Sequence, residues 1–288
     1  MLGIQGIVAA GNNICTREAI DIIPNKNLGN ESNCEGVGNP IHAGTGNKYA
    51  MESDYISSSL SFIRHYNSQQ NKLDRNAGTQ WRNTYSRQLK FSQSDTLFAA
   101  FAERQDGSTL FFTLENDLWI GDEDISAQLF ELPDGNWQLI TSDDATEYYD
   151  IDGKLLAIIN RDGRTKTLTY DSDGRMIAVS DDVGRVLNFA YDGSNRIAAI
   201  TDPADGLYQY AYDVDGNLTS VTYPDNKIRT YHYNEQAYTS GANLPNALTG
   251  ITDENNVRYA TYTYDTKGRA FITEHAGGAD KYTLTYNT

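Results

Sequence analysis

Basic residues are scarce in this 288-residue chain. Lys and Arg number 23 against 39 Asp and Glu, which gives a formal net charge of −16. Grooves that bind nucleic acid and faces that bind anionic membranes need basic residues, so this balance argues against both kinds of partner. The acidic excess is typical of a soluble exterior that resists self-association.

Long apolar runs and cysteines are also few. No run approaches the roughly 18 apolar residues of a membrane-spanning helix. The first ten residues contain no Lys or Arg, which is atypical of a secretory signal, so a signal could have been removed or could lie upstream. The two cysteines, Cys15 and Cys34, lie in a Gly/Asn-rich leader. They could form a disulfide in an oxidising compartment or stay as two thiols in a reducing one, and both alternatives stay open.

Motifs that carry chemistry are missing as well. The four histidines, at positions 42, 65, 232 and 275, have no nucleophile or carboxylate at a recognisable catalytic spacing. No Gly-rich phosphate loop follows a strand and opens a helix. The sequence therefore predicts no catalytic residue, no metal site and no cofactor, and it favours a protein that is not an enzyme.

A tyrosine that returns at a fixed interval dominates the second half of the chain. Five members lie 21 residues apart, and two more follow after intervals of 31 and 22 residues. Self-similarity at a fixed period is typical of a repeat array. The members are Tyr149, Tyr170, Tyr191, Tyr212, Tyr233, Tyr264 and Tyr286.

Each tyrosine opens a turn signal. Asp follows it in five repeats (Asp150, Asp171, Asp192, Asp213, Asp265), and Gly comes four residues after it in four (Gly153, Gly174, Gly216, Gly268). Asp-x-Asp-Gly resembles the start of a calcium-binding loop, but the remaining ligands are absent in register. We expect instead that Asp caps the turn with its side chain and that Gly supplies a positive φ.

Two strands and two turns fit within each interval, which predicts an antiparallel meander. The strand before each tyrosine alternates, as in Phe189/Tyr191 against Asn188/Ala190, so large rings share one face. We expect these rings to stack as a ladder that covers a single-layer sheet. On the other strand, the apolar positions six and nine residues after the tyrosine have opposite parity, which indicates a bulge or an early turn. Outside the array, the best helix candidate is a weak one near Ser94 to Glu103.

The segment before the array carries a long motif. It begins at Asn39-Pro40, passes through Thr45-Gly46 and Tyr49, and continues as a Glu-x-Asp-Tyr step at 52–55. A strand with Leu60, Phe62, Arg64, Tyr66, Asn67 and Ser68 follows. This motif and the repeats together resemble the RHS/YD-repeat proteins over about residues 38 to 288, and the chain is identified as a short member or a fragment.

The resemblance implies an all-β fold, an antiparallel meandering β-sheet strip of YD repeats that forms a partial β-shell. The expected parts are a poorly structured leader (1–38), a β-rich N-terminal module (39–148) and a YD-repeat array (149–288). In such relatives the shell encloses a C-terminal toxin or other cargo, which implies a structural role, a cargo domain or the rest of a shell as partner, and a secreted, cell-surface or periplasmic location.

An alternative function is a secreted or surface binding module. It would recognise carbohydrate or protein through the aromatic sheet face or through residues 235–245, the insertion in the interval from Tyr233 to Tyr264, which holds ten extra residues. Insertions in repeat proteins map to loops and often carry what is specific to one protein.

Overall fold

A computed structural model describes residues 7–10, 13–16, 28–29, 36–37, 40–70, 76–93 and 97–286. Strands make up 51% of the structure, and no α-helix occurs among the described residues. The sheets are antiparallel, which confirms the predicted all-β class. Cys34 lies outside the described residues, and Cys15 is described only as backbone paired with Val8.

The chain divides into two compact units, and the first comprises residues 1–26, 87–104 and 108–163. It contains a β1–β2 hairpin, a sheet of order β11-β10-β9-β8, and the antiparallel succession β12 to β15. The strands are β1 (Ile7–Ala10), β2 (Asn13–Thr16), β8 (Gln88–Gln93), β9 (Phe98–Glu103), β10 (Thr109–Glu115), β11 (Leu118–Gly121), β12 (Gln128–Glu131), β13 (Trp137–Ile140), β14 (Thr146–Tyr149) and β15 (Leu155–Ile159).

The helix candidate at 94–103 is wrong, because its described part from Phe98 onward forms β9. Residues 99–102 are buried on both faces of this central strand, so the run is apolar without alternation. Periodicity alone cannot distinguish such a strand from a buried helix. Phe101 packs on Phe111 of β10 with ring centroids 5.1 Å apart, and this pair forms a buried apolar cluster with Ala99.

The second unit comprises residues 27–86, 105–107 and 164–288. Strands β16 to β26 follow one another in chain order, each antiparallel to the next. We call this succession the YD sheet. Its strands are β16 (Thr165–Tyr170), β17 (Met176–Asp181), β18 (Val186–Tyr191), β19 (Ile197–Thr201), β20 (Leu207–Tyr212), β21 (Leu218–Thr222), β22 (Ile228–Tyr233), β23 (Leu248–Thr252), β24 (Arg258–Tyr264), β25 (Ala270–His275) and β26 (Tyr282–Thr283).

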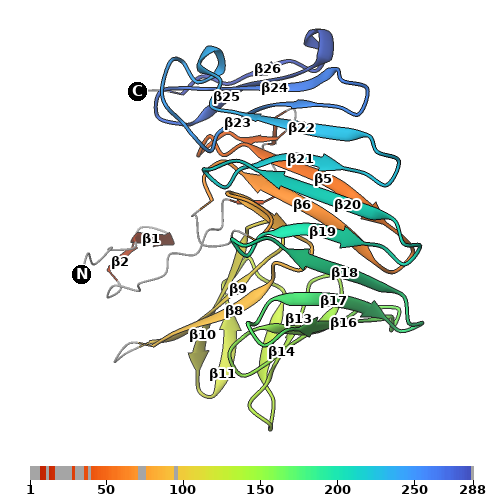
Figure 1. Ribbon diagram of the computed structural model, residues 1–288. Helices are drawn as coiled ribbons and strands as arrows, with labels where there is room; N and C mark the ends of the chain where they lie inside the picture. The colour runs from red at the N-terminus through yellow and green to blue at the C-terminus, as the bar shows by residue number, and fades with distance from the viewer. Residues whose placement is uncertain are drawn as a thin grey trace. The chain divides into compact units, whose positions relative to one another are not determined.

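The same unit holds the small sheet β3 (Gly36–Val37) and β4 (Ile41–His42), a three-stranded sheet and two 3-10 turns, η1 (Gln236–Tyr238) and η2 (Ala276–Gly278). The three-stranded sheet, which we call the cover sheet, consists of β5 (Tyr49–Ile56), β6 (Ser61–Asn67) and β7 (Trp81–Asn83). Figure 1 shows β5 and β6, in orange, running across the teal strands of the YD sheet. The single-layer expectation is therefore wrong for this unit, because the YD sheet has a second layer.

The alternation predicted for the strands before each tyrosine is present in their burial. In β18, Leu187 and Phe189 are buried while Asn188 and Ala190 are exposed. The equivalent buried positions in later strands are Tyr210, Tyr231 and Tyr262. These rings, and not the YD tyrosines that follow them by two residues, form the most consistently buried row of the face.

The other strand of each repeat contains a bulge. Tyr170 pairs with Met176 while Thr169 pairs with Ala178, so Ile177 is the extra residue. The bulge turns both Met176 and Val179 into the core, which explains their opposite parity. Of the two alternatives left open by the sequence, a bulge or an early turn, the register shows the bulge.

Candidate functional site

The YD motif closes each turn with its aspartate. One oxygen of Asp171, Oδ1, accepts the N–H groups of Asp173 (3.0 Å) and Arg175 (2.9 Å). The turn then passes through Gly174, whose φ is +78°. A carboxylate that caps N–H groups in this way forms an Asx-turn. The backbone N–H of Arg175, helped by its guanidinium, holds the pKa of Asp171 below its usual value, although desolvation alone would raise that pKa.

The arginine after the turn links one repeat to the next. Arg175 Nε donates to Asp171 Oδ2 at 2.7 Å, and its guanidinium lies over the ring of Tyr191 at 5.6 Å from the centroid. The Tyr191 hydroxyl donates to the carbonyl of Met176 at 2.8 Å, next to the bulge. A bulge disrupts the local ladder, so the hydroxyl supplies a donor where the strand pairing is irregular.

This relay from Asp to Arg to the next Tyr recurs along the array. Arg196 lies over Tyr212, which donates to the Ile197 carbonyl at 2.8 Å. Arg269 lies over Tyr286, which donates to the Ala270 carbonyl at 2.5 Å. Two strand spacings, about 10 Å, separate tyrosine-bearing strands because another strand lies between them. The contacts between repeats thus differ from the expected ring-on-ring ladder, since an arginine mediates them.

All the residues predicted from the motif lie at these turns. Each YD tyrosine through Tyr264 ends a strand, and Tyr286 follows β26. The five motif aspartates each accept two backbone N–H groups through Oδ1, and the four motif glycines each have φ near +80°. The aspartates are Asp150, Asp171, Asp192, Asp213 and Asp265, and the glycines are Gly153, Gly174, Gly216 and Gly268.

Tyr149, the first YD tyrosine, has a different partner. Its hydroxyl donates to Glu147 Oε2 at 2.5 Å, and Glu147 also accepts from Arg104 at 2.6 and 2.7 Å and from Arg87. The Glu147 side chain is fully buried. Burial alone would raise the pKa of Glu147, but the two arginines lower it to about 2. This carboxylate therefore holds together strands of the first unit.

A buried ionic cluster joins the cover sheet to the YD sheet. Asp54 and Arg64 form a two-pronged ion pair, with Nε to Oδ2 at 2.6 Å and Nη2 to Oδ1 at 2.8 Å. Their side chains are 1% and 0% exposed. Tyr210 donates to Asp54 at 2.8 Å, and Arg64 donates to Tyr231 at 2.6 Å. The two opposite charges neutralise each other within the cover sheet, and hydroxyls from the YD sheet add a hydrogen bond to each, as burial of ions requires.

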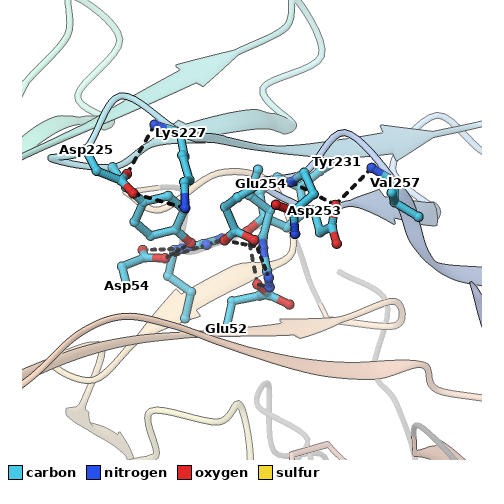
Figure 2. Close-up of polar contacts among 12 residues, drawn as sticks. Glu52, Asp54, Asp225, Lys227, Tyr231, Asp253, Glu254 and Val257 are labelled. Atoms are coloured by element: carbon cyan, nitrogen blue, oxygen red, sulfur yellow. Dashed lines mark hydrogen bonds and ion pairs between the residues drawn. The ribbon is translucent and has the colours of Figure 1, made fainter.

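The cluster continues toward the edge of the cover sheet. Arg229 donates to Glu52 at 2.5 Å and to Glu254 at 3.1 Å. Figure 2 shows Glu52 and Asp54, from the cover sheet, beneath Tyr231 and Glu254 of the YD sheet. Burial alone would lower the pKa of Arg64, but Asp54, Tyr231 and Tyr210 raise it well above its ordinary value. Arg64 is accordingly charged at any physiological pH.

Residues of this cluster lie in the sequence motif before the array, but the motif did not predict that they form an ionic cluster. Phe62, Arg64 and Tyr66 alternate along β6, and all three are fully buried. Phe62 packs on Phe189 and Tyr210, while the Tyr66 hydroxyl donates to the Asn246 carbonyl at 2.9 Å. The missed signal was a charged residue at the centre of an otherwise apolar alternation, beside the acidic Glu52-x-Asp54 step. A buried arginine needs such a partner.

Residues 235–245 form a compact loop. Arg258 binds Glu235 at 2.7 Å and lies 4.8 Å from the centroid of Tyr238. Ser240 donates to the Tyr264 carbonyl at 2.8 Å, and Asn217 donates to the Pro245 carbonyl at 3.0 Å. The insertion is therefore anchored at several points to the strands that flank it.

Across the described part of the chain, no helix has the length and hydropathy to cross a membrane. Within the same part, no group of three or more His, Cys, Asp or Glu side chains could hold a metal ion.

A family model described as Teneurin YD-shell matches residues 135–288, more than half of the chain. The chain belongs to the teneurin YD-shell family. A second model, described as a domain of unknown function (DUF6531), matches residues 38–112. YD-shell membership confirms the RHS/YD-repeat resemblance and supports a structural shell role.

Solved structures give more distant likenesses. The chain is 15% identical to a chain of the Photorhabdus luminescens Tc holotoxin pore, with a TM-score of 0.34. The matched region covers 83% of this chain and 14% of the toxin chain. The TcdB2–TccC3 crystal structure is 16% identical, with a TM-score of 0.34. That match covers 83% of this chain and 15% of the other. This YD-shell chain thus spans at most 15% of either matched chain. No curated protein matches it.

Proposed function

We propose that this YD-shell chain is a non-enzymatic structural segment whose YD sheet forms part of a wall around a toxin or other cargo, in a protein that is secreted or displayed at the cell surface. The ionic cluster supports this proposal most directly. Its charged and aromatic side chains, from both layers, bind one another. These groups therefore hold the two layers of the wall together.

The burial of the aromatic row supports the structural reading over the binding module. A ring must be exposed to stack on a sugar, but Phe189, Tyr210, Tyr231 and Tyr262 are at most 8% exposed. Their contacts are with the cover sheet, as with Trp81 on Tyr231 at 5.4 Å. Tyr191, Tyr212 and Tyr286 in turn contact arginines and backbone carbonyls of their own array. The aromatic face is therefore occupied by the protein itself.

Protease protection tests the enclosing role. The complete reading frame that contains this chain would be produced with and without residues 149–288, and the sequence outside the chain would be followed during trypsin digestion. We expect that outside sequence to be degraded much faster when the array is deleted. Equal degradation rates, or a reading frame that encodes nothing beyond this chain, would contradict cargo enclosure.

A glycan array tests the competing binding module. We expect no selective binding by the wild-type chain. Selective binding that disappears when Tyr238 is replaced by alanine would transfer the function to the 235–245 loop. A hydrolytic activity that persists through purification would contradict the non-enzymatic assignment.

A further inference from the structure

The first unit carries a hollow where two of its sheets meet. Strand β11 ends the β11-β10-β9-β8 sheet, and β12 begins the succession that continues to β15. The hollow has a volume of 780 Å³ and is lined by both strands and by the connection between them. Pockets that bind small molecules have volumes of about 300–1,000 Å³. The hollow is therefore large enough for a small organic ligand.

The separation of β11 and β12 limits what can enter the hollow. Cα atoms of the two strands lie within 8 Å of each other. A strand added between them would need about 9.6 Å, which is twice the usual spacing of about 4.8 Å between neighbouring strands. The hollow therefore has no room for a peptide strand, and its occupant must be a compact molecule that needs no backbone pairing.

Most of the lining is apolar, and part of it is exposed. Leu118, Ile120 and Phe130 are 62%, 44% and 41% exposed, and all three line the hollow. The connection closes one end, because a methyl group added at Gly121 would lie 3.2 Å from Cγ2 of Ile125. Exposed apolar groups around a hollow favour a ligand with an apolar body.

Two carboxylates mark the opposite end of the hollow. The connection from β11 to β12 has six residues, which is too few for a parallel crossover, so the two strands run antiparallel. Asp117, directly before β11, and Glu131, the last residue of β12, therefore lie at the same end, and both line the hollow. Residues 108–153 contain 12 Asp or Glu and no Lys or Arg. A hollow lined by charge of one sign attracts ligands of the opposite sign, in this case cations.

An aromatic ring belongs to the same end of the hollow. Trp119 lines the hollow and packs on Trp137 with ring centroids 5.7 Å apart. Trp137 is in turn the cross-strand partner of Glu131. The face of a tryptophan ring attracts cations, and aromatic rings are the usual means of recognising quaternary ammonium groups. This end thus combines two negative charges with a ring that favours an organic cation.

We infer that this hollow, which we call the β11–β12 hollow, binds an organic cation with an apolar body, such as an alkylammonium ion. The ammonium group lies between Asp117 and Glu131 beside Trp119. The apolar body extends along Ile120 toward the closed end at Ile125. The four residues of β12 accommodate about 14 Å of such a ligand. The inference does not depend on the enclosing role proposed above.

Titration calorimetry on the whole chain tests the hollow with defined probes. The probe is hexyltrimethylammonium. The controls are hexyl sulfate, which has the same tail and the opposite charge, and tetramethylammonium, which lacks the tail. We expect hexyltrimethylammonium to bind at one site, tetramethylammonium to bind at least about tenfold more weakly, and hexyl sulfate not to bind. The affinity should also fall as ionic strength rises toward 1 M, where the screening length is about 3 Å.

Two double variants locate the binding. Asp117→Asn with Glu131→Gln should weaken hexyltrimethylammonium at least about tenfold and keep the fold, because Asn tolerates the φ of +63° at position 117. Glu123→Gln with Asp152→Asn is the matched control, since it removes two exposed charges of the same unit that do not line the hollow, and it should leave the affinity unchanged. If the first double variant lowers the thermal midpoint, Glu131→Gln alone is compared with Glu123→Gln.

Four outcomes would overturn the inference. They are absence of hexyltrimethylammonium binding, equal binding of hexyl sulfate or tetramethylammonium, binding unchanged by the variants at positions 117 and 131, and equal losses with the matched control.

Discussion

Replacing Arg64 by methionine should strongly destabilise the second unit. Methionine keeps the apolar stem but leaves the Asp54 carboxylate, whose side chain is 1% exposed, without its guanidinium. Breaking a buried ion pair by removing one partner costs about 3–5 kcal/mol. Since a domain is stable by only about 5–15 kcal/mol, the variant would lie close to the unfolding threshold.

The double variant Arg64→Met with Asp54→Leu separates two explanations. Replacing a whole buried pair by apolar groups is often neutral or stabilising by about 1–4 kcal/mol. Here Tyr210 also loses its acceptor, and an unsatisfied hydroxyl costs about 1–3 kcal/mol, whereas Tyr231 keeps its bond to Glu52 at 3.4 Å. We therefore expect the double variant to recover roughly 2 kcal/mol relative to Arg64→Met.

Urea unfolding followed by tryptophan fluorescence measures both variants. Trp81 reports on the site directly, because its ring lies 4.8 Å from the Arg64 guanidinium. The urea dependence of the free energy should stay unchanged, so that midpoints can be compared. If the double variant is as unstable as Arg64→Met, the stranded carboxylate is not the cause, and the lost packing of Arg64 on the aromatic rings would explain the effect instead.

Three further perturbations address the turns and the first unit. Tyr212→Phe should cost about 1 kcal/mol in urea unfolding by removing the hydroxyl bond to a bulge carbonyl, whereas Tyr282→Phe at an exposed ring should cost nothing measurable. Gly216→Ala should lower the thermal midpoint more than Gly163→Ala: both have φ above +80°, but only at Gly216 would the new methyl meet another side chain, at 2.9 Å, and equal shifts would contradict this. The pKa of Glu147 is lowered from 4.5 to about 2, so its contribution of roughly 3 kcal/mol to the free energy of unfolding is fully present above pH 4.5 and is lost as the pH falls toward 2. Glu147→Gln should remove this part of the acid dependence of unfolding. An unchanged acid profile would refute the assignment.

The repeat architecture could be predicted because it rests on local patterns. The spacing of the tyrosines, the alternation in strands such as β18 and the turn residues around Gly174 each act within about ten residues. Even the bulge at Ile177 left a trace, since Met176 and Val179 could face one core only if an extra residue lay between them. Asp171 was expected to cap its turn, and its two backbone bonds are those of such a cap.

The cover sheet and the ionic cluster could not be predicted in the same way. Asp54 and Tyr210 are 156 residues apart, and Arg64 and Tyr231 are 167 apart. No local pattern encodes a contact over such a separation. The motif around Arg64 was recognised as a family signature, yet its meaning depends on which surface β6 packs against. The β9 error has a related cause, because a strand buried on both faces loses the alternation that identifies it.

The relay of arginine and tyrosine between repeats gives the array a direction. The bulge carbonyl of one repeat receives its hydroxyl from a residue 15 or 16 positions downstream, as from Tyr191 to Met176 and from Tyr264 to Leu248. As a ribosome releases the chain, each hairpin would therefore be completed only by its successor. Deletions should be tolerated in whole 21-residue steps and not between them. The ten added residues near Gly241 fit this rule, because they precede the Leu248 carbonyl that Tyr264 binds and leave the spacing between that carbonyl and Tyr264 unchanged. The number of strands in the array is thus expected to change in evolution by whole repeats.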